Sequence, residues 1–320
     1  MSPHSASGNG HQHGHGHGQA PGHGSGPGHV HGHDHGTDID WAAMTAQLET
    51  NGELQLPLLR RTAARLGELL GPRTPVRRVL DIGSGPGVMT CVLAEAFPQA
   101  EVVAVDGTPA LLDHTLARAE RLGLHGRITT SHAELPEGLA GLGAADLIWS
   151  SKAVHHLGDQ QAALDGLAAL LRPGGVLAVA EAGLPMRFLP RDIGIGAPGL
   201  QARLDATLEH WFAAMRAELP GSTSVTEDWP AMLGRAGLGP VGAFTDLLDL
   251  PAPLGEPARA FLHGHLTRLR DNTDDEYLDA EDRKTLDALV DPESAEGILR
   301  RPDAFLLSAA TVFTGVRPAR

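Results

Sequence analysis

The residues with the clearest chemical potential form a glycine-rich turn. Residues 79–87 read Val-Leu-Asp-Ile-Gly-Ser-Gly-Pro-Gly, so that Asp81 is followed by Gly83, Gly85 and Gly87. Glycine lets the backbone turn sharply and approach a ligand without obstruction by a Cβ atom. The amide groups of such a turn can meet a carboxylate, and Asp81 can accept a hydrogen bond from an ammonium group. The pattern therefore predicts a site for a zwitterion, with a purely structural turn as the alternative.

Asp106 is the second candidate for ligand binding. It closes the next expected strand, at the carboxyl edge where ligands lie in parallel sheets, and its carboxylate can bond both hydroxyls of a ribose. Its alternative role is to cap the following helix. A dinucleotide site would have the pattern Gly-x-Gly-x-x-Gly, whose third glycine falls on Val88 here. Val88 therefore argues against a dinucleotide.

Two histidines and a glutamate follow later strands and could move a proton. His155 and His156 come after the fourth expected strand, where a histidine of near-neutral pKa can act as a general base. Packing under the following helix is the alternative for His156. Glu181 ends the fifth strand, where its carboxylate could orient an amine or pair with an arginine. Lys152 shares the histidine segment and either points at a substrate or is solvated.

An alternation of expected strands and helices positions these residues. Short, uniformly apolar strands separated by amphipathic helices indicate a parallel sheet covered on both faces. We expect an α/β fold, with a doubly wound, mostly parallel sheet and an antiparallel edge strand. The expected strands are 77–82, 101–106, 127–131, 146–150 and 176–181, and the helices between them are 88–97, 109–122 and 159–171.

Helical segments are expected on both sides of this core, within a single domain that spans residues 37–320. Asn51-Gly52 and Pro57 are expected to break an N-terminal cap into two helices. Trp211 and Phe212 are expected to pack in the core, and His265 is expected to be an ordinary lid histidine. The segments are a helical cap (37–75), the cofactor-binding core (76–184), helical lids (185–238 and 256–302), and C-terminal strands (239–250 and 304–318) that pair as an edge hairpin.

Five stretches give the core a family resemblance. They are Val79–Gly87, Val102–Gly107, His132–Leu135, Asp146–Leu157 and Leu170–Val179. In their order and spacing they resemble the class I S-adenosylmethionine-dependent methyltransferases, over roughly residues 76–182. Each stretch is a weak signal, whereas the set is specific.

The resemblance implies a site for S-adenosylmethionine, whose parts are assigned residue by residue. It implies that Asp81, Gly83, Gly85 and Gly87 contact the methionine part, that Asp106 contacts the ribose, that Ala133 and Glu134 lie by the adenine, and that Ser150 lies near the sulfonium. Ser84, Gly107 and Thr108 belong to the same expected site. Two positions depart from the family pattern. The stretch 131–134 lacks the aspartate that many relatives carry at the adenine, so that backbone atoms of Ala133 would serve instead, and Thr108 stands where relatives often carry a hydrophobic residue that stacks on adenine.

The composition of the chain limits the kinds of partner that it is expected to bind. The formal charge of −14 argues against non-specific binding of nucleic acid or of an anionic membrane surface, which both require clustered basic residues. No apolar stretch reaches the length of a membrane span and no secretory signal is evident, so a cytoplasmic location is expected. The single cysteine, Cys91, is expected to pack inertly in a helix. The sequence does not fix the oligomeric state.

The first 36 residues form a tail rich in histidine and glycine, which we expect to be disordered. Neutral imidazoles at this density bind nickel, zinc, cobalt or copper adventitiously. A functional metal-binding role and a solubilising tail are both left open by the sequence. The candidate metal ligands are His11, His13, His15, His17, His29, His31, His33 and His35.

The sequence therefore favours an enzyme that transfers a methyl group from S-adenosylmethionine to a small-molecule acceptor by in-line displacement. Oxygen is the expected acceptor atom and nitrogen comes next. Catalysis would consist of positioning and of deprotonation of the acceptor. The alternatives are a non-catalytic protein on the same fold that binds S-adenosylmethionine or metal, and a nicotinamide-dependent oxidoreductase.

Overall fold

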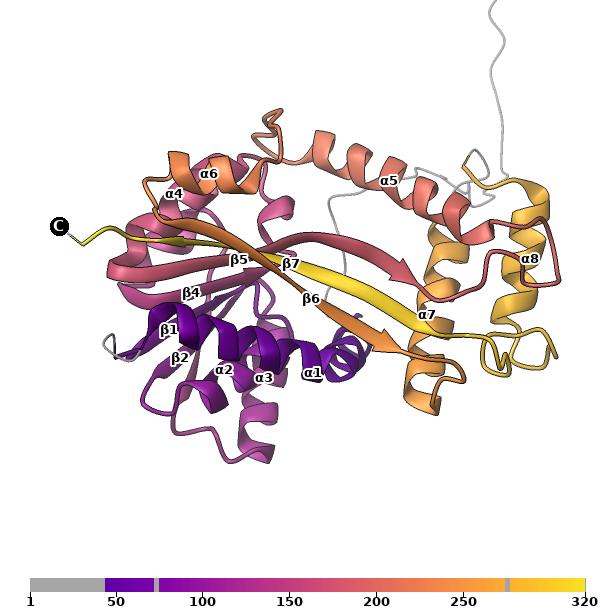
Figure 1. Cartoon of the computed structure of the whole chain (residues 1–320), viewed down its shortest axis with the longest axis horizontal. Coiled ribbons are helices and arrows are strands. Elements are labelled where there is room, and N and C mark those ends of the chain that lie inside the picture. Colours follow the sequence, from indigo (N-terminus) through magenta and orange to yellow (C-terminus); the bar gives the residue numbers. More distant parts are fainter. Residues whose placement is uncertain (1–43, 72–74, 274–276, 320) are drawn as a thin grey trace, which may run out of the picture. The chain divides into compact units, whose positions relative to one another are not determined.

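A seven-stranded sheet forms the centre of the protein (Figure 1). The computed structural model describes residues 44–71, 75–273 and 277–319. The strand order is β3-β2-β1-β4-β5-β7-β6; β1 to β5 are parallel, and β7 is antiparallel to both of its neighbours. The strands are β1 Arg78–Ile82, β2 Glu101–Asp106, β3 Ile128–His132, β4 Ala145–Ser151, β5 Leu171–Arg187, β6 Val241–Leu250 and β7 Leu306–Val316. This arrangement confirms the doubly wound, mostly parallel sheet with an antiparallel pair at one edge.

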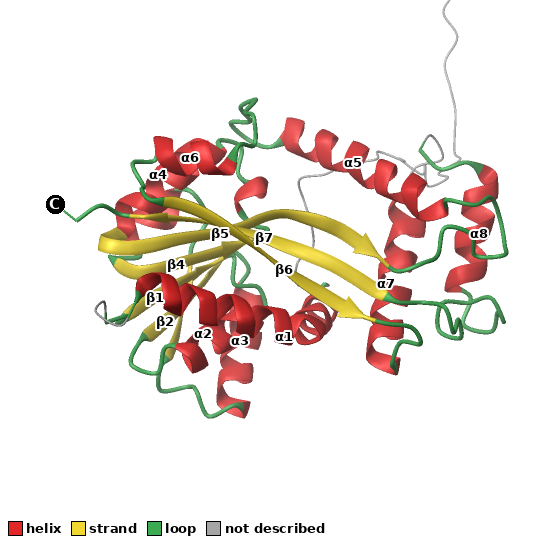
Figure 2. Cartoon of the chain, in the orientation of Figure 1, coloured by secondary structure: helices red, strands yellow, loops and turns green. Residues whose placement is uncertain are grey.

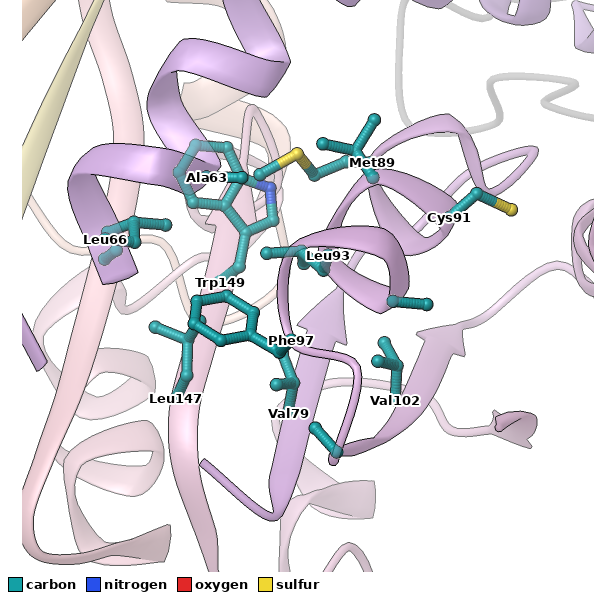
Figure 3. Close-up of a cluster of buried hydrophobic side chains, with 14 of the residues drawn as sticks. Ala63, Leu66, Val79, Met89, Cys91, Leu93, Phe97, Val102, Leu147 and Trp149 are labelled. Carbon is teal, nitrogen blue, oxygen red and sulfur yellow. The ribbon is translucent and has the colours of Figure 1, made fainter. Parts of the chain in front are cut away.

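Helices cover both faces of the parallel part of the sheet. Successive strand residues alternate between the faces, so that Val79 belongs to one buried cluster and Leu80 to the other. Figure 3 shows the first cluster, in which Trp149 of β4 lies close to Leu93 and Phe97. The helices around the parallel strands are α2 Val88–Ala96, α3 Pro109–Arg121, α4 Gln160–Leu170 and α6 Trp229–Arg235, with short 3₁₀ turns at Glu137–Gly141 and Val154–His156.

The N-terminal cap is one helix, α1 (Thr45–Leu70), and the expected break into two helices is wrong. Pro57 lies inside α1 and removes one backbone donor, which ordinarily ends or kinks a helix. Burial outweighs this local cost, because Leu58 and Leu66 on the same helix are almost completely buried. Gly52 also lets α1 approach α2 closely, since a Cβ atom there would lie 2.6 Å from Val88.

Beyond the parallel core, β5, β6 and β7 continue into a helical extension, which we define as α5 (Leu200–Glu218), α7 (Glu256–Asn272) and α8 (Ala280–Val290) (Figure 2). A third hydrophobic cluster joins these helices to the ends of the long strands and to Leu58 of α1. In contrast, α6 packs in the cluster of α4 through Trp229, Met232 and Leu233. Within the described residues, no helix is long and apolar enough to cross a membrane.

Candidate cofactor and catalytic site

The glycine turn after β1 has a backbone shape that favours glycine. Gly83, Gly85 and Gly87 have φ values of 67°, 54° and 76°, in the left-handed region that other residues rarely adopt. A Cβ atom at Gly83 would lie 2.5 Å from Ala153, and one at Gly87 would lie 2.5 Å from Thr115. A Cβ atom at Gly85 would meet nothing within 4 Å. The turn is therefore packed at its two ends and open in the middle, where a ligand can approach.

The amides of this turn are bonded within the protein. Gly83 and Ser84 donate to the carbonyl oxygen of Val105, at 2.9 and 3.1 Å, and Gly85 donates to a carboxylate oxygen of Asp106 at 2.9 Å. The amide of Gly87 donates to the carbonyl oxygen of Ser84. A ligand carboxylate would compete with these bonds, so the expected contact between the amides and a carboxylate stays a prediction.

Asp81 is a buried carboxyl group beneath the turn. The hydroxyl of Thr90 donates to it at 2.6 Å, and only 2% of the residue is exposed. Burial raises the pKa of Asp81 to about 7, and the nearby charge of Asp106 adds to the increase. No salt bridge to Asp81 occurs in the described part of the chain. A cationic ligand group near Asp81 would hold it ionised, which fits the ammonium of a methionine moiety.

Asp106 lies where the ends of β2 and β3 meet the turn. Besides the amide of Gly85, it accepts the amide of Thr108 at 2.9 Å, and burial raises its pKa. The N-cap of α3 is Thr108, so the alternative role of Asp106 as the cap residue is not observed. Asp106 remains the carboxylate at the carboxyl edge that could accept ribose hydroxyls.

The expected adenine residues lie beside this edge. Ala133 is buried and donates its amide to the carbonyl oxygen of Asp106 at 3.2 Å. Glu134 has a largely exposed side chain whose carboxylate lies beside Gly107, within 3.1 Å of where a Cβ atom would stand. The structure thus brings Asp106, Gly107, Ala133 and Glu134 together, and their contact with adenine stays a prediction.

Two serine hydroxyls at the site bear on whether it can bind a polar ligand. The hydroxyls of Ser84 and Ser150 are buried and have no hydrogen-bond partner in the described residues. Ser150 lines an otherwise apolar crevice with Ile82, Ala153 and Val154, among other residues. An unsatisfied buried hydroxyl costs about 1–3 kcal/mol, so a hydrogen bond from a ligand would stabilise Ser84 beside the open turn, whereas the crevice at Ser150 has no room for a water-sized group. The open turn, the buried Asp81 and these hydroxyls fit S-adenosylmethionine.

The strongest catalytic constellation centres on Glu181. Its side chain is completely buried, and one carboxylate oxygen accepts the amides of Ala153 and Val154, at 3.0 and 2.8 Å. The other oxygen lies 2.6 Å from Nδ1 of His155. Glu181 thus orients His155 and holds the turn after β4, rather than pairing with an arginine.

His156 extends this pair to a row of three groups. Its Nε2 lies 3.1 Å from Nε2 of His155. Burial lowers the pKa of His156 to about 4, helped by His155 and by the charge of Arg216, so His156 is neutral near pH 7. The Glu181 carboxylate lies on the opposite side of the His155 ring from His156 and orients it. The row can act as a general base.

Helix α5 supports this constellation through residues that the sequence analysis did not assign to it. Arg216 donates to the carbonyl oxygens of His155, Leu157 and Gly158, which fixes the turn. The ring of Phe212 contacts His155 edge-on with centroids 5.3 Å apart. Phe212 and Arg216 are four residues apart on one helix face, and this spacing was the available signal. Trp211, expected in the core, is 42% exposed.

The expected metal ligands of the tail, from His11 to His35, lie outside the described residues. Within residues 44–71, 75–273 and 277–319, no group of three or more histidine, cysteine or acidic side chains could hold a metal ion. Cys91 is buried, and burial raises its pKa to about 11, which keeps the thiol protonated.

Comparison with known proteins gives matches centred on the core. Residues 80–177 match a methyltransferase domain family. A trans-aconitate 2-methyltransferase from Methylobacterium radiotolerans is 34% identical over 149 residues, which are 43% of this chain and 55% of that protein. One from Deinococcus radiodurans is 38% identical over 120 residues, 38% of this chain and 43% of that protein. The biotin biosynthesis bifunctional protein BioCD from Bordetella avium is 42% identical over 118 residues, 37% of this chain and 24% of that protein.

The chain thus spans about half or less of the length of these relatives. The matched domain, residues 80–177, carries the glycine turn, Asp106 and the segment after β4. The match to the domain family and the sheet order agree with the resemblance of the five sequence stretches. Residues 80–177 therefore carry a methyltransferase domain that is similar to the class I S-adenosylmethionine-dependent methyltransferases.

Proposed function

We propose that the protein transfers a methyl group from S-adenosylmethionine to a small-molecule acceptor. The acceptor atom that we favour is an oxygen, and a nitrogen is the second choice. The observation that carries this proposal is the row of Glu181, His155 and His156 directly after β4. The trans-aconitate 2-methyltransferases among the relatives support a small-molecule acceptor.

Different residues of the chain would bind the cofactor and take up the proton of the acceptor. S-adenosylmethionine supplies an electrophilic methyl group when bound. Asp81 would hold the ammonium of its methionine part, and Asp106 would hold the ribose. The hydrogen-bonded pair of His155 and His156, oriented by Glu181, would take the proton of the acceptor as the new bond to carbon forms.

Helix α5 would keep water away from this proton transfer. The edge-on contact of Phe212 with His155 covers one side of the imidazole, and Arg216 holds the turn in place. A dry site favours transfer of the methyl group to the acceptor over transfer to water.

Binding and turnover test the proposal separately. Calorimetry should show saturable binding of S-adenosylhomocysteine and none of NADH; binding of NADH alone would contradict the proposed cofactor. Release of S-adenosylhomocysteine in the presence of a panel of hydroxyl and amine acceptors then measures turnover. A protein that binds the cofactor but turns over no acceptor in the panel would favour the non-catalytic alternative.

The catalytic assignment is tested by His155→Gln, with His125→Gln as the control. His125 lies on the loop before β3 with a largely exposed side chain. His155→Gln should lower turnover about 100-fold, the usual contribution of a general base, and leave S-adenosylhomocysteine affinity unchanged. The control should match the wild type, and equal turnover in both variants would remove His155 from the mechanism.

A further inference from the structure

Arg216, near the carboxyl end of α5, binds the backbone of the turn that carries the catalytic histidines. Its Nη1 donates to the carbonyl oxygens of His155 and Leu157, at 2.8 and 2.6 Å, and its Nη2 donates to that of Gly158 at 3.4 Å. In the part of the chain that the structure describes, Arg216 forms no salt bridge. An arginine presents its donors in a rigid, planar fork. The guanidinium therefore holds residues 155–158 in one backbone shape.

The segment that follows α5 packs against the same turn. A Cβ atom at Gly158 would lie 2.1 Å from the carbonyl oxygen of Pro220, so a larger residue there would displace one of the two backbones. The amide of Thr223 donates to the carbonyl oxygen of Gly158 at 3.1 Å, and the hydroxyl of Ser222 donates to that of Arg216 at 2.8 Å. Arg216 and residues 219–223 thus meet residues 155–158 in one contact, which we call the α5 junction.

The turn is held at its other end by β5. Lys152, just before the turn, adopts a positive φ of 51° and donates its amide to the carbonyl oxygen of Ala180 at 3.1 Å. Glu181 accepts the next two amides and lies 2.6 Å from Nδ1 of His155. His155 lies between the two supports, with its ring bonded to Glu181 and its carbonyl oxygen bonded to Arg216. The parallel core therefore fixes only one end of the turn that carries His155.

Helix α5 also touches the ring of His155 directly. Phe212 precedes Arg216 by four residues, so both side chains leave the same face of the helix. The ring of Phe212 lies edge-on against the imidazole of His155, whose side chain is only 17% exposed. A movement of α5 away from the turn would uncover this imidazole and release the carbonyl oxygen of His155 at the same time.

The amino-terminal half of α5 is anchored without the junction. Gln201 accepts two backbone amides of the chain after β5, at 3.1 and 3.2 Å. Arg203 forms two bonds to the buried carboxylate of Asp282 on α8, at 2.5 and 2.7 Å. Between this anchor and the junction the helix is partly open to solvent, with Trp211 42% exposed. Loss of the junction should therefore leave α5 attached and the protein folded.

We propose that Arg216 is a positioning residue, which acts through the α5 junction to place His155 in the catalytic row of Glu181, His155 and His156. The base then depends on a helix outside the parallel core, and α5 has to be seated on the turn before the row takes up a proton. A displacement of about 1 Å in a reacting group can cost about 100-fold in rate. This inference rests on the proposed function and deepens it, because it states what the geometry of the base depends on.

The reactivity of His155 towards diethyl pyrocarbonate tests the inference without turnover. This reagent modifies neutral imidazoles that it can reach, and mass spectrometry of peptides identifies the histidine. The full chain is saturated with S-adenosylhomocysteine, and His125, with 64% of its side chain exposed, is the internal reference. Arg216→Met and Gly158→Ala should each speed the modification of His155 about fivefold or more, because both open the junction, and should leave the rate at His125 unchanged.

Turnover and binding give the second measurement. Each variant should lower kcat at saturating acceptor about tenfold or more and leave S-adenosylhomocysteine affinity unchanged. The double variant should lose no more than the larger single effect, because both changes act through one junction. The controls Arg235→Met and Gly126→Ala should match the wild type: Arg235 bonds to the side chain of Gln161, and a Cβ atom at Gly126 would meet nothing within 4 Å.

The outcomes separate this inference from the proposed function. Unchanged reactivity of His155 in both variants would overturn the inference, whether or not the protein turns over an acceptor. Faster modification with wild-type kcat would also overturn it, because His155 would have moved without a cost. A wild type that binds S-adenosylhomocysteine but methylates nothing would contradict the proposed function, and the reactivity of His155 would still decide whether the junction positions it. If Arg216→Met loses S-adenosylhomocysteine binding, Gly158→Ala decides alone, and loss of binding in both would show a structural role and overturn the inference.

Discussion

Asp81→Asn should stabilise the protein while it weakens cofactor binding. Burial raises the pKa of Asp81 from 3.8 to about 7. The unfolded chain ionises this carboxyl group near pH 4, whereas the folded chain keeps the proton until about pH 7. The folded state therefore binds more protons between these values, and its stability falls as the pH rises through them.

The size of this effect follows from the shift. A pKa change from 3.8 to about 7 amounts to about 4 kcal/mol of lost stability once the pH exceeds 7. Asparagine carries no charge and can still accept the hydrogen bond from Thr90. The variant should therefore exceed the wild type by up to about 4 kcal/mol in free energy of unfolding at pH 8, and by less than about 1 kcal/mol at pH 4.

Urea denaturation of the variant and the wild type at pH 4 and pH 8 measures this difference in free energy of unfolding. The contributions of all other titratable groups are the same in both proteins and cancel when the two are subtracted. Asp246→Asn is the matched control: Asp246 is also buried and bonded to a threonine, Thr62, but it lies 3.6 Å from Arg65. Loss of its charge should destabilise the protein at pH 8. An Asp81→Asn variant that is less stable than the wild type at pH 8, or whose gain does not depend on pH, would refute the reasoning.

The same carboxyl group links cofactor binding to pH. A cationic ligand group holds Asp81 ionised, so binding of S-adenosylhomocysteine to the wild type at pH 7 should release about half a proton. Calorimetry in buffers of different ionisation enthalpy measures this release. Asp81→Asn should bind S-adenosylhomocysteine more weakly and release no such proton; proton release equal to that of the wild type would assign the linkage to another group.

Three further predictions concern other parts of the chain. Glu181→Gln should lower turnover of a hydroxyl acceptor about tenfold or more without a change in S-adenosylhomocysteine affinity, because it removes the charge that stabilises protonated His155; unchanged turnover would contradict the base role. Pro57→Ala should raise the free energy of unfolding by about 1–3 kcal/mol, since it restores a backbone donor inside α1, and denaturation that shows no gain would contradict this account. Deletion of residues 1–36 should remove most retention on a nickel resin and leave S-adenosylhomocysteine affinity unchanged; lost affinity would mean that the tail belongs to the site.

The parallel core was predictable because each of its strands is a local apolar run. Strand β2 occupies Glu101–Asp106, the bounds expected from the sequence. Helix α1 was not predictable in the same way. Pro57 is a strong local signal for a break, whereas the burial of Leu58 and Leu66 that outweighs it depends on elements far along the chain.

The candidate site was likewise predictable only in part. Asp81 and Asp106 could be placed because parallel strands bring their carboxyl ends to one edge of a sheet. The contact between Glu181 and His155 depends instead on the register that sets Ser151 opposite Ala180. No local pattern encodes such a register.

The charges at the sheet edge suit the chemistry of methyl transfer from a sulfonium. Asp81 on β1 is a buried carboxyl group that forms no salt bridge within the described residues. A cationic cofactor would supply the charge that Asp81 lacks, and it would attract an anionic acceptor in a site of low dielectric constant. Transfer of the methyl group consumes the positive charge of the sulfonium, which weakens the hold on both products. An anionic acceptor should therefore bind more tightly beside a sulfonium than beside the uncharged sulfur of S-adenosylhomocysteine. A sulfonium analogue that cannot transfer its methyl group should accordingly raise the affinity for citrate above the affinity measured with S-adenosylhomocysteine. Equal affinities would mean that the charge of the sulfonium does not act on the acceptor.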